Sequence, residues 1–366
     1  MTWDFDKKPM LVFWETTKAC DLACRHCRAE AISEPMPGEL THQEGLDLIE
    51  QITQFGKPYP VLILTGGDVL RRQRLFDLIA HAHQYGMHLG LAPSVTPLLT
   101  EAAIDHLYES GVNTISLSLD GAGPETHDQL RGVDGAFART LAMTRYAAKK
   151  GITVQINSTV MASNLLELPS LFSTIHECGA SIWEVFFLIQ TGRGSETVEA
   201  TAEECESVCH FLYHASQYNM IVRTVEAPFF RRVVSWYNAG TAPVLDDLAS
   251  VLVADLRNQM GLPRQVPSTG TARTRDGRGI VFIAHNGEVT PSGFLPVSVG
   301  NVRKTPLRDC YQDSALMNCL RNNESLGGRC GLCSFRDACG GSRARAFAAT
   351  GDVMAQDQSC MYVPSF

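Results

Sequence analysis

Hydrophobic and polar positions alternate with two different periods along the first 225 residues. Short runs rich in β-branched and aromatic residues predict six strands, over residues 10–16, 61–65, 88–92, 114–119, 153–160 and 183–189. Apolar residues recur at helical spacing between and after these runs, which predicts helices over residues 41–55, 72–85, 100–110, 135–150, 165–178 and 201–217. The repeated strand–helix unit predicts a parallel sheet covered by helices.

Six such units are typical of a partial (β/α)6 barrel of the TIM type, an α/β fold related to the complete eightfold barrel. We assign this barrel to residues 1–225. Because functional residues of such barrels collect at the carboxyl ends of the strands, we expect the site there.

The pattern changes after residue 225. Residues 226–278 form a connecting segment in which a helix over 244–260 precedes a loop rich in Pro, Gly and Thr, a possible substrate-binding loop. Residues 279–366 form a small second domain. It begins with two short strands around Asn286-Gly287, a strong hairpin signal, and continues with a helix over 307–321 and a cysteine-rich tail.

The composition excludes some classes of function. With 366 residues and 19% charged residues, the chain is an ordinary globular protein, and its net charge of −8 argues against nucleic-acid binding. No apolar run is long enough to span a membrane, and no signal peptide is evident, so we expect a cytoplasmic protein with no membrane association. Twelve cysteines in such a chain indicate metal or redox chemistry.

Three cysteines follow the first predicted strand. Cys20, Cys24 and Cys27 are spaced Cys-x3-Cys-x2-Cys. Three thiolates can hold three irons of a [4Fe–4S] cluster and leave the fourth iron open to a small molecule. A structural zinc site normally takes four ligands, and three close cysteines pair poorly as disulfides.

A second cysteine group lies near the C-terminus. Cys330, Cys333 and Cys339 are spaced Cys-x2-Cys-x5-Cys, and Cys360 follows. Four thiolates can close a zinc site or a complete [4Fe–4S] cluster, and the spacing alone leaves both open. Single free cysteines more often behave as small buried hydrophobes, which is our expectation for Cys178, Cys205, Cys209, Cys310 and Cys319.

The first cysteine loop resembles that of the radical S-adenosylmethionine (SAM) enzymes. The resemblance implies that the open iron binds SAM and that reductive cleavage of SAM yields methionine and a 5′-deoxyadenosyl radical. It implies that His26, before the third cysteine, packs near the adenine. A flavodoxin or ferredoxin would be the electron donor.

Further motifs carry the same resemblance. Thr65-Gly66-Gly67-Asp68 resembles the family's GGE motif, with Asp in place of Glu. Its glycines let the backbone approach the ammonium group of SAM closely. SLSLDG at 116–121 and HDQLRG at 127–132 are similar to segments that contact the ribose and the SAM carboxylate. The further SAM contacts that we expect are Ser94, Ser118, Asp120, Arg131, Asn157 and Phe187.

The cysteine-rich tail resembles the auxiliary-cluster segment of radical SAM enzymes with SPASM or twitch domains. The similarity is greatest to the branch containing the siroheme-pathway heme synthase, the enzymes of dihydro-heme formation and an uncharacterised sister group. Pro291-Ser292 stands where the full SPASM domain commonly has Pro-Cys, so we expect a twitch-like domain with one auxiliary [4Fe–4S] cluster.

The resemblance implies an oxidoreductase that abstracts a substrate hydrogen and passes an electron to the auxiliary cluster. Oxidative decarboxylation of tetrapyrrole propionates is the favoured reaction. The alternatives are modification of a ribosomal peptide and a non-catalytic iron–sulfur electron carrier or redox sensor.

Two segments bear on a tetrapyrrole substrate. Arg231 and Arg232 could meet carboxylates while Phe229 and Phe230 pack on the ring, although an ordinary amphipathic segment is the more frequent case. His285 could ligate a heme iron, but we expect an exposed turn histidine.

Overall fold

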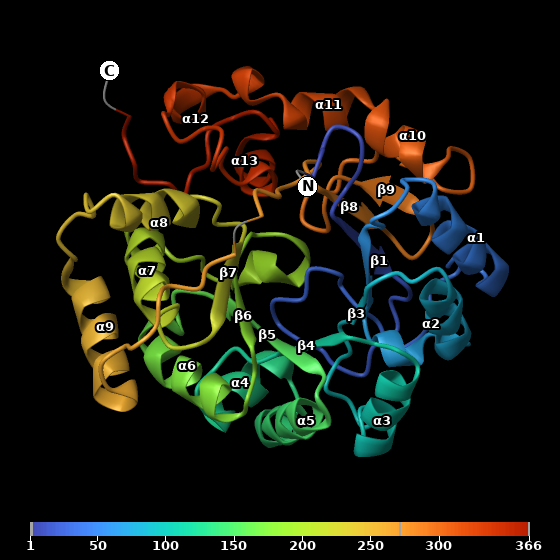
Figure 1. The fold of residues 1–366 in the computed structure, drawn as a ribbon, viewed down its shortest axis with the longest axis horizontal. Helices are drawn as coiled ribbons and strands as arrows, with labels where there is room; N and C mark the ends of the chain where they lie inside the picture. Colours follow the sequence, from blue (N-terminus) through green and yellow to red (C-terminus); the bar gives the residue numbers. More distant parts are fainter. Residues whose placement is uncertain (1–2, 271, 365–366) are drawn as a thin grey trace.

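The computed structural model describes residues 3–270 and 272–364, so residues 1, 2, 271, 365 and 366 of the predicted segments lie outside the description. The described chain forms a ten-stranded sheet in the order β10-β9-β8-β1-β2-β3-β4-β5-β6-β7 (Figure 1). The pairs from β8 through β1 to β7 are parallel, while β9 pairs antiparallel with both β8 and β10. The strands are β1 Leu11–Glu15, β2 Val61–Thr65, β3 Leu89–Leu91, β4 Thr114–Ser118, β5 Thr153–Val160, β6 Ile182–Phe187, β7 Ile221–Val225, β8 Ile280–Ile283, β9 Glu288–Thr290 and β10 Gly300–Asn301.

Helices cover the outer face of the curved sheet (Figure 1). The helices of the barrel are α1 His42–Thr53, α2 Leu75–Gln84, α3 Glu101–Glu109, α4 Pro124–Arg131, α5 Ala136–Lys150, α6 Leu168–Glu177 and α7 Ala202–Ala215, and those of the connecting segment are α8 Phe230–Asn238 and α9 Asp247–Met260. The helices of the C-terminal region, at the top of Figure 1, are α10 Leu307–Gln312, α11 Ala315–Arg321, α12 Gly328–Leu332 and α13 Arg343–Thr350.

Local sequence signals define several helix ends. The side chains of Thr41 and Thr201 accept the N–H of Glu44 and Glu204, whose carboxylates accept the Thr N–H in return. These reciprocal capping boxes start α1 and α7 where the sequence pattern changes. Trp183 on β6 is fully buried between the sheet and the helices, and its indole N–H donates to Ser158 Oγ at 2.9 Å.

All six strands predicted for the first half form, within two residues at each end. The structure adds β7 and β8 to the parallel part of the sheet. Because β8 pairs directly with β1, the predicted boundary at residue 279 falls between segments that share one sheet. Residues 268–270 run along β7, with Val222 N–H donating to Ser268 O at 2.9 Å and Gly270 N–H donating to Val222 O at 3.1 Å.

Two other predictions need correction. The helix predicted over 307–321 is divided into α10 and α11, because Ser314 accepts the N–H of Met317 and starts a new helix. The connecting segment contains α8, which was not predicted, and α9, which packs against α6 and α7 of the barrel. Within the described residues, every helix is too short or too polar to cross a bilayer.

Candidate active site

A cavity of about 840 Å³ occupies the inside of the curved sheet. This volume lies near the upper end of the range of about 300–1,000 Å³ for ligand pockets, so it can hold SAM together with part of a second ligand. The predicted site residues that line it are Cys20, Cys24, His26, Cys27, Thr65, Gly66, Gly67, Ser94, Ser118, Asp120, Arg131, Asn157 and Phe187.

The first cysteine loop lies at the carboxyl end of β1, where functional residues of such barrels are expected. Cys20 and Cys24 are 6% and 8% exposed, and Cys27 is partly exposed. The sulfur of Cys20 accepts the N–H of Leu22 at 3.4 Å, and that of Cys24 lies 3.6 Å from a guanidinium nitrogen of Arg131. Burial raises the pKa of the Cys20 thiol, and the donors around these sulfurs favour a ligated thiolate.

The glycine pair after β2 holds this loop through main-chain contacts. Gly67 N–H donates to Thr17 O at 2.8 Å, and Asp68 N–H donates to Ala19 O at 2.7 Å. A Cβ on Gly67 would lie 2.5 Å from Lys18 O and 2.6 Å from Ala19 O. Only glycine therefore allows this close approach of the two backbones.

Asp68 is placed differently from the other predicted SAM contacts. Its side chain is fully buried and is not among the described residues that line the cavity. The carboxylate accepts from Thr96 Oγ1 at 2.7 Å and from the N–H of Ser94 at 3.3 Å, and Ser94 Oγ donates to Gly67 O at 2.7 Å. The predicted direct contact between Asp68 and SAM is therefore corrected. Asp68 instead positions Ser94, which in turn holds the glycine turn through Gly67 O.

Asp120 is the centre of the charged network beside the cysteines. It is 1% exposed, forms an ion pair with Arg131, accepts the N–H of Thr159 at 2.8 Å, and lies 3.5 Å from His26 Nε2. Burial alone would raise the pKa of Asp120, but Arg131 and the two nearby histidines lower it to about 2. The carboxylate is therefore ionised and directs Arg131 toward Cys24.

Both histidines near this network are held neutral at ordinary pH. Burial lowers the pKa of His26, with Arg131 opposing its protonation. His127 Nδ1 accepts the N–H of Asp120, and burial together with Arg131 lowers its pKa to about 4. His26 is a flat neutral ring at the cavity wall, suited to packing against an adenine.

The second cysteine group forms a separate small pocket. Its lining includes all four predicted ligands, Cys330, Cys333, Cys339 and Cys360. Each sulfur has a donor, three of which are Gly341 N–H to Cys339, Phe335 N–H to Cys333 and Asp357 N–H to Cys330, each at 3.4 Å. The fourth is a guanidinium N–H of Arg232 to Cys360, at 3.8 Å.

The spacing of these thiols favours a cluster over zinc. Among the described residues, no three Cys, His, Asp or Glu side chains lie close enough together to hold a single metal ion. Sulfurs around one tetrahedral zinc would be only about 4 Å apart, given Zn–S bonds of about 2.3 Å. A four-iron cluster places its ligands farther apart and takes hydrogen bonds at its sulfurs, which fits this pocket.

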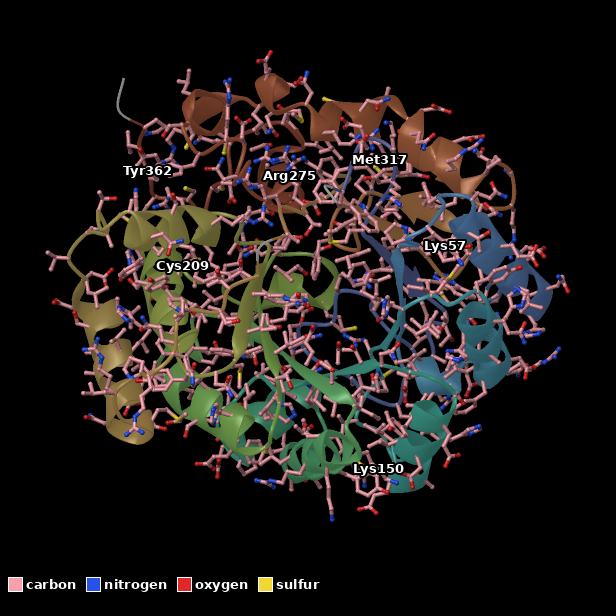
Figure 2. All side chains as sticks on the ribbon, in the orientation of Figure 1. Lys57, Lys150, Cys209, Arg275, Met317 and Tyr362 are labelled. Carbon is pink, nitrogen blue, oxygen red and sulfur yellow. The ribbon has the colours of Figure 1, made fainter. Side chains whose placement is uncertain are left out.

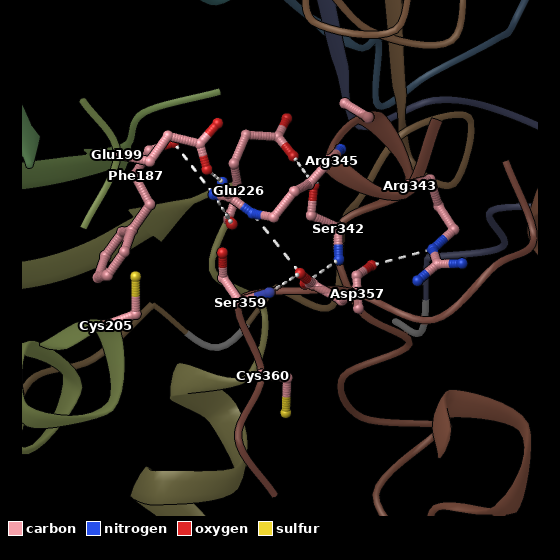
Figure 3. Close-up of polar contacts among 12 residues, drawn as sticks. Phe187, Glu199, Cys205, Glu226, Ser342, Arg343, Arg345, Asp357, Ser359 and Cys360 are labelled. Atoms are coloured by element: carbon pink, nitrogen blue, oxygen red, sulfur yellow. Dashed lines mark hydrogen bonds and ion pairs between the residues drawn. The ribbon is translucent and has the colours of Figure 1, made fainter. Parts of the chain in front are cut away.

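One turn of the C-terminal region separates the two sites. Gly341 lines both the central cavity and the cysteine pocket, and Ser342 lines the central cavity. The Ser342 hydroxyl donates to the Glu226 carboxylate, and its N–H donates to Asp357 at 2.7 Å (Figure 3). A Cβ on Gly341 would lie 3.0 Å from Cys330 Sγ. Glycine at this position therefore lets the backbone between the two sites lie close to the cysteine pocket.

Sequence reasoning missed two residues of the site. Arg193 donates to Cys24 O and Ala31 O, both at 3.0 Å, and so holds the cysteine loop. Glu226 follows β7 with a positive φ of 60° and lines the cavity, and burial raises its pKa well above the usual value. Both residues lie in segments that follow a strand of the barrel, and this position is the sequence feature that could have identified them.

Only part of the segment over residues 229–232 can contact a substrate in the cavity. Arg232 is 1% exposed and forms a bidentate ion pair with Glu206, at 2.7 and 2.6 Å, so its predicted contact with a substrate carboxylate is wrong. Phe229 is fully buried, whereas Phe230 and Arg231 line the cavity. Buried arginines need paired acceptors, which explains why Arg232 faces Glu206.

His285 and the remaining cysteines have structural positions. His285 is 9% exposed with Nδ1 3.4 Å from Glu15, so the expected exposed turn histidine is wrong. Cys205 and Cys209 are buried on α7, and Cys209 is labelled in Figure 2. Burial raises the pKa of Cys205 to about 12. Cys178 and Cys310 are also buried, and Cys319 is partly exposed.

Known proteins are similar in sequence to this chain along nearly its whole length. Residues 14–167 match the family model of the Radical SAM superfamily. An AdoMet-dependent heme synthase from Methanosarcina barkeri (strain Fusaro / DSM 804) is 36% identical over 361 residues, covering 97% of each chain. This chain belongs to the radical SAM superfamily. It is an enzyme, and radical SAM enzymes use a [4Fe–4S] cluster and SAM.

A second relative is also similar along most of the chain, and a solved structure shares the fold. Pre-heme d1 synthase from Dinoroseobacter shibae (strain DSM 16493 / NCIMB 14021 / DFL 12) is 30% identical over 366 residues, covering 96% of this chain and 86% of that one. The structure of Streptococcus suis SuiB bound to S-adenosylmethionine has a TM-score of 0.66 at 14% identity. It covers 97% of this chain and 78% of SuiB, which confirms the predicted barrel fold.

Proposed function

We propose that this radical SAM enzyme oxidises the propionate side chains of a tetrapyrrole, with its SAM-binding cluster on Cys20, Cys24 and Cys27. One observation supports the proposal most. A single large cavity brings these cysteines and the expected SAM contacts together, and a thin wall separates it from a second four-cysteine pocket. The tetrapyrrole substrate rests on the heme synthase and pre-heme d1 synthase relatives.

The bound cluster and SAM would supply the 5′-deoxyadenosyl radical, and the protein would bind and orient the reactants. Arg131, held by Asp120, would face the SAM carboxylate. The carbonyls of Gly66 and Gly67 would accept from the SAM ammonium, whereas the Thr65 carbonyl already accepts from the N–H and the hydroxyl of Thr16, at 2.8 and 3.0 Å, and is corrected to a structural role. Such fixed donors and acceptors cost no reorganisation when the reaction occurs.

Other lining residues would hold the rest of SAM. Ser118 and Asn157, neighbours on β4 and β5, line the cavity and would contact the ribose, while His26 and Phe187, which also line it, would flank the adenine. Ser94 completes this surface and is itself positioned by Asp68.

The second pocket would receive the electron that the oxidation releases. Oxidative decarboxylation of one propionate removes a hydrogen atom, carbon dioxide and one electron, and leaves a vinyl group. We propose Cys330, Cys333, Cys339 and Cys360 as ligands of an auxiliary [4Fe–4S] cluster that accepts this electron. The proposed domains are the barrel over residues 1–225, the connecting segment 226–278 and the twitch-like domain 279–366, with a flavodoxin or ferredoxin as the external reductant.

The test is product formation from an iron porphyrin that carries propionates. Anaerobically reconstituted protein would be reduced with dithionite in the presence of SAM and iron coproporphyrin. We expect more 5′-deoxyadenosine than without porphyrin, and a product that has lost carbon dioxide and two hydrogens per side chain. Cys24→Ala is the control that should form neither product.

An unchanged porphyrin, together with equal deoxyadenosine formation with and without it, would contradict the proposal that a tetrapyrrole is the substrate. Modification of a peptide would then be the leading reaction for the same radical chemistry.

A further inference from the structure

The inner wall of the cavity has two chemically different halves. The strands β1, β2 and β8 present mainly apolar side chains, whereas β4 to β7 also present polar ones, beside apolar residues of β6 and β7 such as Phe186 and Phe187. The apolar lining residues of β1, β2 and β8 are Leu11, Phe13, Val61, Ile63, Ile280 and Phe282. Barrel interiors are usually packed with branched apolar residues, so the polar half is the unusual one.

One row of polar residues crosses the four strands of the polar half in register. Ser118 on β4 pairs with Asn157 on β5, Asn157 pairs with Glu184 on β6, and Glu184 pairs with Arg223 on β7. All four line the cavity. With strands about 4.8 Å apart, Arg223 lies roughly 14 Å along the sheet from Ser118, at the far end of the row from the expected SAM contacts.

Most arginines that line this cavity are already occupied by the protein. Arg131 is paired with Asp120, and Arg28 donates to Gly293 O at 2.9 Å. Arg231 donates to Ala338 O and Thr274 O at 3.1 and 2.6 Å, and Arg275 donates to Leu320 O at 3.0 Å. These four arginines therefore stabilise the protein or, in the case of Arg131, belong to the expected SAM site.

Arg223 differs from them. Across residues 3–270 and 272–364, its guanidinium has no hydrogen bond and no ion pair within 4.0 Å. Its stem is held by the backbone that runs along β7, because a Cβ on Gly270 would lie 2.8 Å from Arg223 Cγ. A cation held at the cavity wall, with no acceptor among the described residues, is suited to an anionic ligand group.

Glu184 does not occupy Arg223, although the two residues are cross-strand neighbours. The Glu184 carboxylate instead accepts from Gln155 Nε2 at 2.7 Å. Burial raises the pKa of Glu184, with Arg223 and Gln155 opposing the rise. The polar row thus offers a free cation beside a carboxyl group that burial shifts toward its neutral form.

We propose that Arg223 binds a carboxylate of the substrate and so orients an apolar, carboxylate-bearing ligand across the cavity, with its ring against Phe13 and Ile63. The proposal rests on the function proposed above, since a propionate of the tetrapyrrole would be this carboxylate. A planar guanidinium binds a carboxylate with two parallel hydrogen bonds, which fixes orientation as well as affinity.

The test is an anaerobic absorbance titration of the reconstituted protein with iron coproporphyrin in the presence of SAM. Arg223→Gln should weaken binding about 10- to 100-fold, the range for losing one charge-assisted contact. Arg223→Lys, which keeps the charge but not the fork, should lie between wild type and Arg223→Gln. Arg74→Gln, at an exposed arginine on the outside, is the matched control and should bind as wild type does.

A second pair of variants separates substrate binding from a purely structural role. If Arg223 only compensated Glu184, adding Glu184→Gln to Arg223→Gln would restore porphyrin binding. We expect no restoration, because the double variant still lacks the guanidinium.

Three results would overturn the inference while leaving the proposed function standing: unchanged porphyrin binding in Arg223→Gln, restoration by Glu184→Gln, or an equal loss of SAM affinity in Arg223→Gln. Failure of the wild-type protein to bind iron coproporphyrin would instead refute the tetrapyrrole substrate, and the inference would fall with it.

Discussion

Replacing Asp120 with Asn tests the charged network beside the first cysteine loop. The substitution keeps the size of the side chain and an oxygen for the Thr159 N–H, but removes the charge that pairs with Arg131. Arg131 would remain charged with only 14% of its side chain exposed. It would also lose the partner that directs it toward Cys24, so both stability and SAM cleavage should fall.

The shifted pKa of Asp120 sets the scale of the stability effect. A lowering from 3.8 to about 2 corresponds to about 2 kcal/mol of stabilisation by the ionised form. Breaking a buried pair by removing one partner typically costs about 3–5 kcal/mol, because the remaining charge is uncompensated. For a chain of this size, 2–5 kcal/mol lowers the midpoint of thermal unfolding by roughly 3–6 °C.

The pH dependence has a defined sign. The folded-state pKa of Asp120 is lower than the unfolded-state value, so the stabilisation is complete above about pH 4. It is lost as the pH falls from about 4 through about 2. The Asp120→Asn variant should lack this part of the acid dependence.

The assay combines thermal unfolding of the anaerobic protein with 5′-deoxyadenosine formation from SAM and dithionite. Asp134→Asn, at an exposed position nearby, is the matched control and should resemble wild type in both measurements. An Asp120→Asn protein that unfolds at the wild-type temperature and cleaves SAM at the wild-type rate would refute the reasoning about this network.

Three further predictions follow from the packing around the cysteines. Gly67→Ala should lower the iron content by several-fold, because its Cβ would lie 2.5 and 2.6 Å from the carbonyl oxygens of Lys18 and Ala19, and wild-type loading in iron and sulfide analysis would contradict this. Cys205, with its pKa raised to about 12 by burial, should resist iodoacetamide at pH 8 in the folded protein and react only after denaturation, as followed by peptide mass spectrometry. Cys333→Ala should lose about four irons and substrate turnover while uncoupled SAM cleavage continues, and an unchanged iron content would exclude Cys333 as a ligand.

The barrel could be predicted from the sequence because its strands are short apolar runs separated by amphipathic helices. The strand β7 was missed because Arg223 and Thr224 interrupt the apolar run that marks a buried strand. The pairing of β8 with β1 is a contact between residues about 270 positions apart, and no local pattern encodes it.

The cysteine groups and most lining residues were also predictable, since spacing and position after a strand identify them. The roles of individual polar groups were not. Arg231 and Arg232 are adjacent in sequence, yet Arg232 is bound to Glu206 on α7 and Arg231 faces the cavity, a distinction set by helix orientation. Asp68 likewise turns away from the cavity, because its short carboxylate accepts hydrogen bonds from Thr96 Oγ1 and from the Ser94 N–H.

An aromatic cluster near the second pocket also depends on tertiary contacts. Trp236, Phe335 and Tyr362 meet edge to face, with centroids 5.6–6.1 Å apart, and Tyr362 is labelled in Figure 2. The guanidinium of Arg232 lies 4.3 Å from the centroid of Trp236 and 4.9 Å from that of Tyr362. Phe335 and Tyr362 line the pocket and help to shield its sulfurs from water.

The central claim is a two-cluster radical SAM enzyme, and iron and sulfide per chain measured together with 5′-deoxyadenosine formation test it most directly. Anaerobically reconstituted protein should contain about eight irons and eight sulfides and should form deoxyadenosine from SAM and dithionite. About four irons plus one zinc would contradict the auxiliary cluster, and a fully loaded, reduced protein that forms no deoxyadenosine would contradict the proposed SAM site itself.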